Sequence, residues 1–438
     1  MLTCTDIKSF EFIMIAFPDI EGKLRGHIIP ISHLSDIYEG VPFDGSSIPF
    51  TGIEKSDMIF RASKREKVRK LPGCRYRTGI VFGEVYWPDG KPVDVYPRYI
   101  ARKFEEKLKS SGIAPKVALE PEFYLLVAES SQNSESKIRS VDAVRRNGVY
   151  FYINPLIDNT LTFQQEISRF LVSQGIDVER THHEVGPGQI EITFKYGGIV
   201  EVSDNLLYLK QVAKQLAKRK GWIATFMPKI NPQLAGNGLH VHVNLVDSKG
   251  RNIFCDSNDR YGLSQTAYYF IGGILYYASE IAVLLAPTVN SYKRLVSFHE
   301  APTHICYGPF NRSALIRIPA GKAKIEVRFP DGSMNPYIGL VAIVAAGLRG
   351  VKDTIQPPEP LERNAYKEEG IPQLPSTLSE AIEHAESSGI LRETFGKGFV
   401  ETYLILRKRE LREFENKVGR FDPGEVSQWE LQRYLLDV

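Results

Sequence analysis

The chain has 438 residues, of which 43% are hydrophobic and 24% are charged, a composition typical of a globular protein with two domains or with one large and one small domain. Its formal net charge of +3 is too small for this length to indicate nucleic-acid binding. The four cysteines (Cys4, Cys74, Cys255 and Cys306) stand far apart without a C-x-x-C pair, which argues against a zinc or disulfide framework and favours a reducing cytoplasm.

The first 95 residues are predicted to form a mostly β domain. Residues 10–31, FEFIMIAFPDIEGKLRGHIIPI, contain two β runs joined by a polar Asp/Gly turn, and residues 78–93, TGIVFGEVYWPDGKPV, predict a second pair of strands with an Asp-Gly turn. Between them, VPFDGSSIPF at 41–50 is predicted to be a loop, because Pro, Gly and Ser interrupt any regular period. We expect no signal peptide and no membrane span, since the N-terminus lacks a basic region with a cleavage site and no apolar run is long enough.

Residues 96–438 are predicted to form a larger α+β domain, because amphipathic helices alternate with strands there. Helical periodicity is clear in five segments: residues 96–113, 159–176, 204–221, 267–286 and 401–419. One local run, residues 61–77, holds a single acid among many bases. We read that run as a solvated face, and a docking surface for an acidic partner is the alternative.

Four predicted strands carry charged side chains on one face, because residues two apart on a strand point the same way. They are KVALEPEFYLLV with Glu120 and Glu122, RTHHEVGPGQIEI with His182, Glu184 and Glu191, GNGLHVHVNLV with His240, His242 and Asn244, and AKIEVRF with Lys324, Glu326 and Arg328. For one strand alone, the simpler reading is a solvent-exposed face of an antiparallel sheet. Four such faces together favour convergence on one site, provided that the strands are neighbours.

Converging carboxylates predict a metal site rather than a histidine zinc motif. Five carboxylates would repel one another unless cations lay between them. Carboxylates with one or two imidazoles are hard ligands that suit Mg²⁺ or Mn²⁺. Guanidinium groups that match phosphate and carboxylate geometry follow along the chain: Arg294, Arg312, Arg317 and Arg328. This combination predicts phosphoryl transfer, and the absence of a G-x-x-x-x-G-K-[ST] motif argues against a P-loop mechanism.

An ordered series of motifs spans almost the whole chain: FDGSSI with SDM, EPEFYL, GVYF, HHEVGPGQIEI, TFMPK, GNGLHVH, APTVNSYKRL, NRSALIRIP, IEVRFPD and NPY. By this series the chain resembles the glutamine synthetase family, in the type I form of bacteria and archaea. The resemblance implies a small N-terminal β-grasp domain and a large catalytic α/β domain built on an antiparallel sheet. It also implies two stacked hexameric rings of identical subunits, with each active site between neighbouring subunits.

The resemblance implies a reaction and its metal ligands. ATP would phosphorylate the γ-carboxylate of L-glutamate, and ammonia would displace phosphate from the γ-glutamyl phosphate to give glutamine. Two Mg²⁺ or Mn²⁺ ions would be held by six side chains, Glu122, Glu184 and Glu191 for one ion and Glu120, His240 and Glu326 for the other.

The resemblance also assigns roles to other residues. Substrate-binding positions are Tyr150, Gly236, Arg294, Glu300, Arg312 and Arg328, and ATP-binding positions are Glu179, His242, Asn244, Arg312, Arg317 and Lys324. Three residues would act in catalysis. Asp44 of the neighbouring subunit would attract and deprotonate ammonium. Glu300 would lie on a flap that shields the acyl phosphate from water, and Arg312 would neutralise charge on the transferring phosphoryl group.

Some positions outside the metal ligands depart from the family pattern. Ala235 stands where asparagine is usual before Gly236, Asn244 stands where serine is usual, and the flap reads SFH at 297–299 where Pro-Gly-Tyr is common. These departures leave open a second enzyme, which would join glutamate to a polyamine, ethanolamine or methylamine. Retention of Asp44 favours ammonia. The six intact metal positions argue against a third alternative, a non-catalytic relative that keeps the fold.

Overall fold

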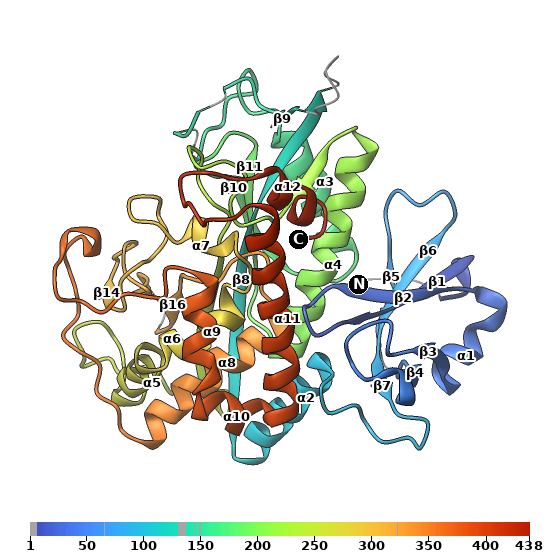
Figure 1. Ribbon diagram of the computed structural model, residues 1–438, viewed down its shortest axis with the longest axis horizontal. Helices are drawn as coiled ribbons and strands as arrows, with labels where there is room; N and C mark the ends of the chain where they lie inside the picture. The colour runs from blue at the N-terminus through green and yellow to red at the C-terminus, as the bar shows by residue number, and fades with distance from the viewer. Residues whose placement is uncertain (1–6, 65, 130–136, 145, 149, 322) are drawn as a thin grey trace.

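The computed structural model describes residues 7–64, 66–129, 137–144, 146–148, 150–321 and 323–438. It consists of a small, mainly β N-terminal unit (residues 7–86) and a larger C-terminal unit (residues 97–438), which lie side by side in Figure 1. In the larger unit a central sheet is covered by helices. The predicted α+β class is confirmed.

Two small sheets form the N-terminal unit. The first has the strand order β2-β1-β6-β5, in which β1 pairs antiparallel with β2 and parallel with β6. The second has the order β3-β4-β7 and is antiparallel. The elements are η1 Ile7–Ser9, β1 Phe12–Pro18, β2 Leu24–Pro30, η2 Ile31–His33, α1 Leu34–Glu39, β3 Val41–Asp44, η3 Ile53–Lys55, β4 Asp57–Arg61, β5 Arg69–Lys70, β6 Thr78–Phe82 and β7 Glu84–Tyr86.

Of the two hairpins predicted here, the first is confirmed, since β1 and β2 pair along their full lengths. The second prediction is wrong in its return strand, because after the turn the chain makes only a single bridge, between Tyr86 and Pro92. The run 78–86 instead divides at Gly83 into β6 and β7, which belong to different sheets. A Cβ on Gly83 would lie 2.5 Å from the ring of Phe60, so the chain can pass between the sheets here only with glycine.

A nine-stranded sheet forms the centre of the C-terminal unit. Its order is β10-β11-β8-β13-β16-β15-β14, and β9 and β12 also pair with β8. Every pair is antiparallel except β14 with β15. Strand β8, 17 residues long, runs through the whole unit in Figure 1. The strands are β8 Ile113–Glu129, β9 Lys137–Ser140, β10 Val178–His183, β11 Gln189–Phe194, β12 Ile223–Thr225, β13 Leu239–Asp247, β14 Tyr307–Pro309, β15 Ile316–Ile318 and β16 Ile325–Val327.

Four of the five predicted helices are single helices, and the fifth, residues 267–286, is broken. It forms α5 and α6, which are bent by 75° at Tyr277. Among the described residues no single helix is long and apolar enough to cross a membrane, and this bent pair passes that test only when both halves are combined. The helices are α2 Pro97–Ser110, α3 Leu161–Ser173, α4 Ile199–Arg219, α5 Gln265–Tyr276, α6 Ala278–Leu285, α7 Ser291–Arg294, α8 Pro336–Lys352, η4 Ala365–Lys367, α9 Leu378–Glu386, α10 Gly389–Phe395, α11 Lys397–Lys417 and α12 Gln428–Tyr434.

A buried ion-pair network centred on Arg98 joins the two units. Arg98, at the start of α2, is 3% exposed and donates to Glu84 of the N-terminal unit at 2.6 Å. It also donates to Asp204 on α4 at 2.9 Å and to Glu66 at 2.9 Å. The Tyr337 hydroxyl on α8 donates to Asp204. The network therefore ties β7, α2, α4 and α8 together in one place.

Candidate active site

The four charged strands are neighbours in the central sheet, as their convergence requires. Their registers place His240 opposite Glu120, Glu122 opposite Glu191, His242 opposite Glu326 and Arg317 opposite Glu326. These side chains therefore come from β8, β11, β13, β15 and β16, five strands that are consecutive in the sheet.

Both faces of β8 are buried. Leu119, Phe123 and Leu125 have no exposed surface, and on the other face Glu120 and Glu122 are each only 7% exposed. A solvated polar face, the simpler reading of the alternation, is therefore wrong for this strand. Burial of charge is costly unless the charge is paired or binds a cation, so this face needs partners.

Glu120, His240 and Glu326 form the first cluster, in which one potential ligand atom from each lies within 4.8 Å of the others. Two side chains of neighbouring strands contact it: Arg317 donates to Glu326 at 2.6 Å, and His242 Nε2 lies 3.0 Å from Glu120. Burial raises the pKa of Glu120, but the contact with His242 outweighs burial and holds the pKa at about 2. The first cluster is thus a preformed anionic site that fits a divalent cation.

Glu122, Glu184 and Glu191 form the second cluster. Ligand atoms of Glu191 lie within 4.8 Å of those of Glu122 and His240 on one side, and of Glu184 and His182 on the other. Burial raises the pKa of Glu122 to about 7, and the negative charge of Glu191 adds to the rise. Burial and both neighbouring carboxylates raise the pKa of Glu184 as well. A divalent cation would relieve this repulsion, so the second cluster also fits a metal.

The adjacent histidines His182 and His183 have different contacts. Buried His183 lies 2.6 Å from Asp142 through Nε2 and 2.7 Å from the Glu184 carbonyl oxygen through Nδ1. Burial lowers the pKa of His183, but these two acceptors outweigh it and raise the pKa. His182 Nε2 lies 3.1 Å from Glu191, inside the second cluster. His183 therefore supports the β10–β11 hairpin, whereas His182 touches a candidate ligand directly.

Two buried arginines lie beside the clusters. Arg328, 1% exposed, donates to Glu326 of the first cluster. Arg294, 3% exposed, donates to the carbonyl oxygens of Phe329 at 2.9 Å and of Arg328 at 3.1 Å. A Cβ on Gly236 would lie 2.7 Å from the Arg294 side chain, so glycine at 236 is what allows Arg294 its position.

Several buried polar atoms on the strands of the first cluster and after β11 have no hydrogen-bond partner. They are His242 Nδ1, Asn244 Oδ1, Arg317 Nε and the Tyr196 hydroxyl. Buried polar atoms are nearly always paired, so such a group indicates room for a polar ligand. Lys324 Nζ lies 5.6 Å from the centre of the Tyr196 ring, and Glu179 on β10 is exposed. Tyr196 was not predicted, because β11 ends at Phe194 and strand alternation does not extend beyond it.

Tyr150, Glu300 and Arg312 lie together at the mouth of the site. Glu300 and Arg312 line an open cavity of about 970 Å³. Burial and the negative charge of Glu184 raise the pKa of Tyr150 to about 12, while the positive charge of Arg312 opposes the rise. The three residues therefore share one electrostatic environment next to the second cluster.

The segment that bears Glu300 has an unusual backbone. Phe298 and Glu300 have positive φ angles of 67° and 56°, a region that residues other than glycine adopt infrequently. The Tyr366 hydroxyl donates to the carbonyl oxygen of Ala301 at 3.1 Å, and the Tyr366 ring packs against Phe298 with centroids 5.1 Å apart. These contacts hold a conformation that the local sequence does not favour.

A lysine–histidine contact connects this segment to the loop before Gly236. Lys229 Nζ lies 3.3 Å from His299 Nδ1 and donates to the carbonyl oxygen of Leu234 at 2.7 Å. Burial and the charge of Arg294 lower the pKa of Lys229 to about 8. Burial and the charge of Lys229 lower the pKa of His299, so its neutral form accepts the hydrogen bond.

Asp44 lies in the N-terminal unit, away from the clusters. It ends β3, so the segment predicted as a loop at 41–50 begins as an edge strand, where Pro42 is tolerated. Asp44 accepts hydrogen bonds from the Ser46 amide at 2.8 Å and from the hydroxyls of Ser46 and Ser47, which hold its pKa at about 2. In Figure 1, β3 lies in the N-terminal unit at the right, whereas β10 and β11 lie in the upper part of the C-terminal unit. One chain therefore does not bring Asp44 to the clusters.

Comparison with known proteins gives two matches that together cover most of the chain. Residues 94–434 match the glutamine synthetase catalytic domain, and residues 9–88 match the glutamine synthetase beta-Grasp domain. The chain belongs to the glutamine synthetase family. The predicted family and the predicted two-domain architecture are thereby confirmed, and the N-terminal and C-terminal units are the β-grasp and catalytic domains of this family.

Named relatives match over nearly their whole length. Glutamine synthetase of Pyrococcus abyssi is 40% identical over 444 residues, which cover 98% of this chain and 97% of that protein. Glutamine synthetase of Thermotoga maritima is 38% identical over 442 residues, with the same coverage. Among solved structures, GmaS in complex with ADP superposes with a TM-score of 0.86 at 27% identity, covering 99% of this chain and 100% of that chain.

Proposed function

We propose that this protein is a glutamate–ammonia ligase. ATP phosphorylates the γ-carboxylate of L-glutamate, and ammonia then displaces phosphate from the γ-glutamyl phosphate to give glutamine. The observation that carries the proposal is the convergence of five buried carboxylates and His240 beside two buried arginines. This constellation occurs in a chain that is 40% identical to a protein named glutamine synthetase.

The two clusters are the proposed metal sites, for Mg²⁺ or Mn²⁺. Glu122, Glu184 and Glu191 hold one ion, and Glu120, His240 and Glu326 hold the other. Bound ions supply positive charge that neutralises phosphate oxygens during transfer. The protein contributes the rest: Arg317, which donates to Glu326, is the proposed ligand of phosphate oxygens, and the buried surroundings would strengthen such a contact.

The remaining residues divide between the two substrates. Arg294 and Arg328 bind the carboxylates of glutamate, Gly236 leaves room for Arg294, and Arg312 stabilises the transferring phosphoryl group. The proposed ATP-binding residues are Glu179, His242, Asn244, Arg312, Arg317 and Lys324. Tyr196 joins them, because its ring offers the nucleotide a flat surface and its buried hydroxyl lacks a partner.

Subunit assembly completes the proposed site. Asp44 is ionised, exposed and remote from the clusters of its own chain, so we assign it to the ammonium site of a neighbouring subunit, together with Tyr150 and Glu184. A pKa of about 2 suits Asp44 for attracting ammonium better than for removing its proton. This assignment requires an oligomer, for which we propose two stacked hexameric rings in the cytoplasm, built from a β-grasp domain of residues 1–95 and a catalytic domain of residues 96–438.

The acceptor is tested by measuring ATP-dependent phosphate release with glutamate and ammonium, and then with methylamine, ethanolamine and polyamines. We expect the highest kcat/KM with ammonium, with product formation verified by mass spectrometry. Activity with an amine and none with ammonium contradicts the ammonia assignment. Absence of glutamate-dependent turnover with every acceptor contradicts the enzyme proposal and favours a non-catalytic relative.

The second candidate, ligation of glutamate to a larger amine, has specific observations in its favour. GmaS structures superpose on this chain over 99% of its length. Ala235, which precedes the proposed substrate-binding Gly236, lacks a side-chain amide, and the flap carries Phe298, whose side chain is 67% exposed. The same amine panel separates the two candidates.

Substitution of His299 is expected to uncouple the reaction. Without the Lys229 contact the flap opens more readily, water reaches the acyl phosphate, and the ratio of phosphate released to amide formed rises by roughly fivefold in His299→Ala. His299→Gln, whose side-chain oxygen can accept the same hydrogen bond, should restore coupling. The ratio is measured by parallel phosphate and amide assays. Unchanged coupling in His299→Ala contradicts the role assigned to this contact.

The same contact predicts a pH dependence. The pKa of His299 lies below 6.5, so the neutral acceptor form prevails at neutral pH. Acidification protonates His299 and places two positive charges beside each other, which breaks the contact. The ratio of phosphate released to amide formed should therefore rise as the pH falls below 6.5 in the wild type. In His299→Gln this ratio should not change with acidification.

A further inference from the structure

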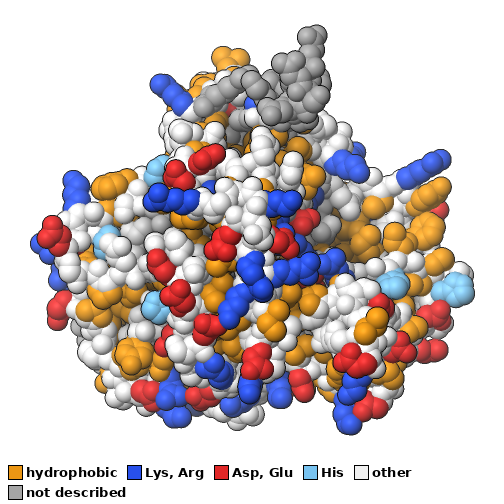
Figure 2. Space-filling view, in the orientation of Figure 1, with side chains coloured by type: hydrophobic (Ala, Val, Ile, Leu, Met, Phe, Trp, Pro, Cys, Tyr) orange, Lys and Arg blue, Asp and Glu red, His pale blue; other side chains and the backbone are white. Residues whose placement is uncertain are grey.

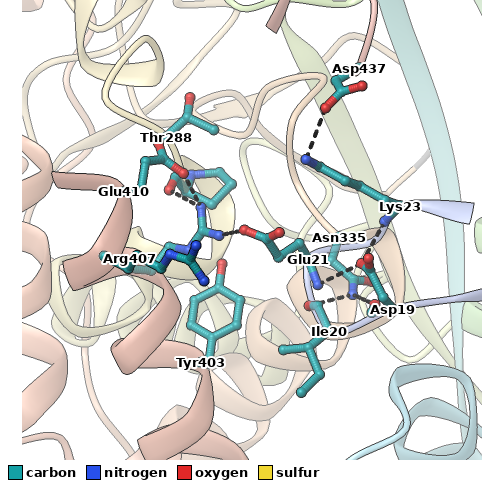
Figure 3. Close-up of polar contacts among 12 residues, drawn as sticks. Asp19, Ile20, Glu21, Lys23, Thr288, Asn335, Tyr403, Arg407, Glu410 and Asp437 are labelled. Atoms are coloured by element: carbon teal, nitrogen blue, oxygen red, sulfur yellow. Dashed lines mark hydrogen bonds and ion pairs between the residues drawn. The ribbon is translucent and has the colours of Figure 1, made fainter. Parts of the chain in front are cut away.

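A second cavity, of about 420 Å³, lies at the junction of the two domains and shares no residue with the proposed active site. We call it the junction cavity. Its walls are the β1–β2 turn, α4, α11 and the residues that follow α12. Figure 3 shows this junction, with Glu21 reaching from the turn to Arg407 on α11 and Lys23 reaching to Asp437. The cavity therefore has one wall from the β-grasp domain and the others from the catalytic domain.

Positive charge predominates in the lining of the junction cavity. Six cationic side chains line it, Lys23, Arg25, Lys210, Lys214, Arg407 and Arg433, against three carboxylates, Glu21, Glu410 and Asp437. Figure 2 shows Lys and Arg side chains gathered on the surface where α11 meets the β-grasp domain. Cationic side chains therefore outnumber carboxylates in the lining itself, and two further carboxylates, Asp19 and Glu413, pair with Arg25 and Arg433 from outside it.

Four of the six cations have carboxylate partners. The ion pairs are Lys23 with Asp437 at 3.1 Å, Arg25 with Asp19 at 2.8 Å, Arg407 with Glu410 at 2.8 Å and Arg433 with Glu413 at 2.7 Å. Arg407 is 2% exposed, and its Nε atom is buried without a hydrogen-bond partner. The guanidinium forks of this wall are therefore largely occupied by carboxylates, apart from the Nε of Arg407.

Lys210 and Lys214 lack a carboxylate partner among the described residues. They lie one turn apart on α4, which places them on the same side of the helix. Lys210 Nζ donates to the carbonyl oxygen of Gly332, and Lys214 Nζ donates to that of Leu436 at 2.8 Å. Burial lowers the pKa of Lys210 to about 7 and that of Lys214 to about 8. Carbonyl oxygens do not neutralise an ammonium group, and the carboxylates whose negative charge acts on the two amines, Asp331 on Lys210 and Asp437 on Lys214, form no ion pair with them.

We propose that the junction cavity binds a phosphate group, held by the ammonium groups of Lys210 and Lys214 and by the free Nε–H of Arg407. Lysine binds phosphate as a compact point charge, whereas a carboxylate ligand would prefer an open guanidinium fork. A bound phosphate supplies the directly paired negative charge that neither amine has. Because Lys23 and Arg25 line the same cavity, the ligand also strengthens the contact between the two domains. The proposal does not depend on the reaction assigned to the active site.

Calorimetric titration of the full chain with inorganic phosphate at constant ionic strength tests the proposal. Lys210→Met and Lys214→Met are each expected to raise the Kd for phosphate at least tenfold. The matched control is Lys218→Met, which removes an exposed charge from the same helix and should change the Kd less than twofold. Phosphate bound at the active site contributes equally in all four proteins. Equal phosphate binding by the wild type and by Lys210→Met overturns the proposal.

Thermal unfolding and a titration with a phosphomonoester test whether weaker phosphate binding reflects loss of the site rather than loss of the fold. In chloride buffer, Lys210→Met should unfold at or above the wild-type Tm, because it removes a buried amine that makes no ion pair, and Lys214→Gln serves as a second variant. Addition of phosphate should raise the wild-type Tm more than that of Lys210→Met. Parallel titration with sn-glycerol 3-phosphate distinguishes a site for free phosphate from one for a phosphomonoester. Equal Tm increases in the wild type and Lys210→Met count against the site.

Discussion

Glu122→Ala is expected to lower ATP-dependent phosphate release, with glutamate and the preferred amine present, by about a thousandfold or more, which corresponds to about 4 kcal/mol of transition-state stabilisation. Glu122 is one of the three carboxylates of the second cluster and accepts a hydrogen bond from the Gly238 amide at 2.7 Å. Loss of this carboxylate removes one ligand of a proposed metal ion and leaves the first cluster intact. Phosphate-release assays at saturating metal measure the effect.

His240→Ala is expected to weaken metal binding more than Glu122→Ala does. His240 offers a potential ligand atom to a group in each cluster. Calorimetric titration with Mg²⁺ should show one ion lost in Glu122→Ala and weakened binding of both in His240→Ala. Glu106→Ala, an exposed carboxylate on α2, is the control and should retain full activity. Metal-free Glu122→Ala should stay folded, since burial raises the pKa of Glu122 to about 7 and the substitution removes a repelling charge. Full turnover in either ligand variant would refute the metal assignment.

Arg98→Met is expected to lower the free energy of unfolding by about 3–5 kcal/mol, the usual loss when one partner of a buried ion pair is removed. The substitution leaves Glu84 and Asp204 buried beside each other without the guanidinium that pairs with both. Burial raises the pKa of Glu84, and the charge of Asp204 raises it further while Arg98 lowers it. Urea unfolding followed by circular dichroism measures the loss.

Lys103→Met, on an exposed side of the same helix, is the control for Arg98→Met and should change the free energy of unfolding by less than about 0.5 kcal/mol. In the Arg98 variant we expect the β-grasp domain to lose contact first, seen as faster hydrogen exchange in β7. A loss below about 1 kcal/mol would mean that water or a rearranged Arg102, which lies 3.2 Å from Glu84, replaces the buried charge.

Local sequence predicted which charged side chains share a strand face. Strand alternation placed Glu120 and Glu122 on one face and Leu119 and Phe123 on the other, and the structure has this arrangement. Alternation could not say whether that face was solvated or buried, because burial depends on which strands pair. The antiparallel register that sets His240 opposite Glu120 joins residues 120 positions apart, and nothing in either segment encodes it.

Other features arise only from contacts between distant segments. The break at Tyr277 interrupts a continuous apolar helical pattern, and the separation of β6 from β7 at Gly83 depends on the neighbouring Phe60 ring. Tyr196 lies beyond the end of β11 and reaches the site through tertiary packing. The Lys229–His299 contact joins two loops that are 70 residues apart.

The sequence by itself determined the family, the two-domain order and the chemical character of the site, because these depend on residue types at short spacing. Only the tertiary structure decided that the charged faces meet and are buried, and that two lysines without an ion-pair partner in the described part of the chain line the junction cavity. The physical reason is that charge and hydrophobic period are local properties, whereas burial and the pairing of charges depend on what the rest of the chain brings alongside.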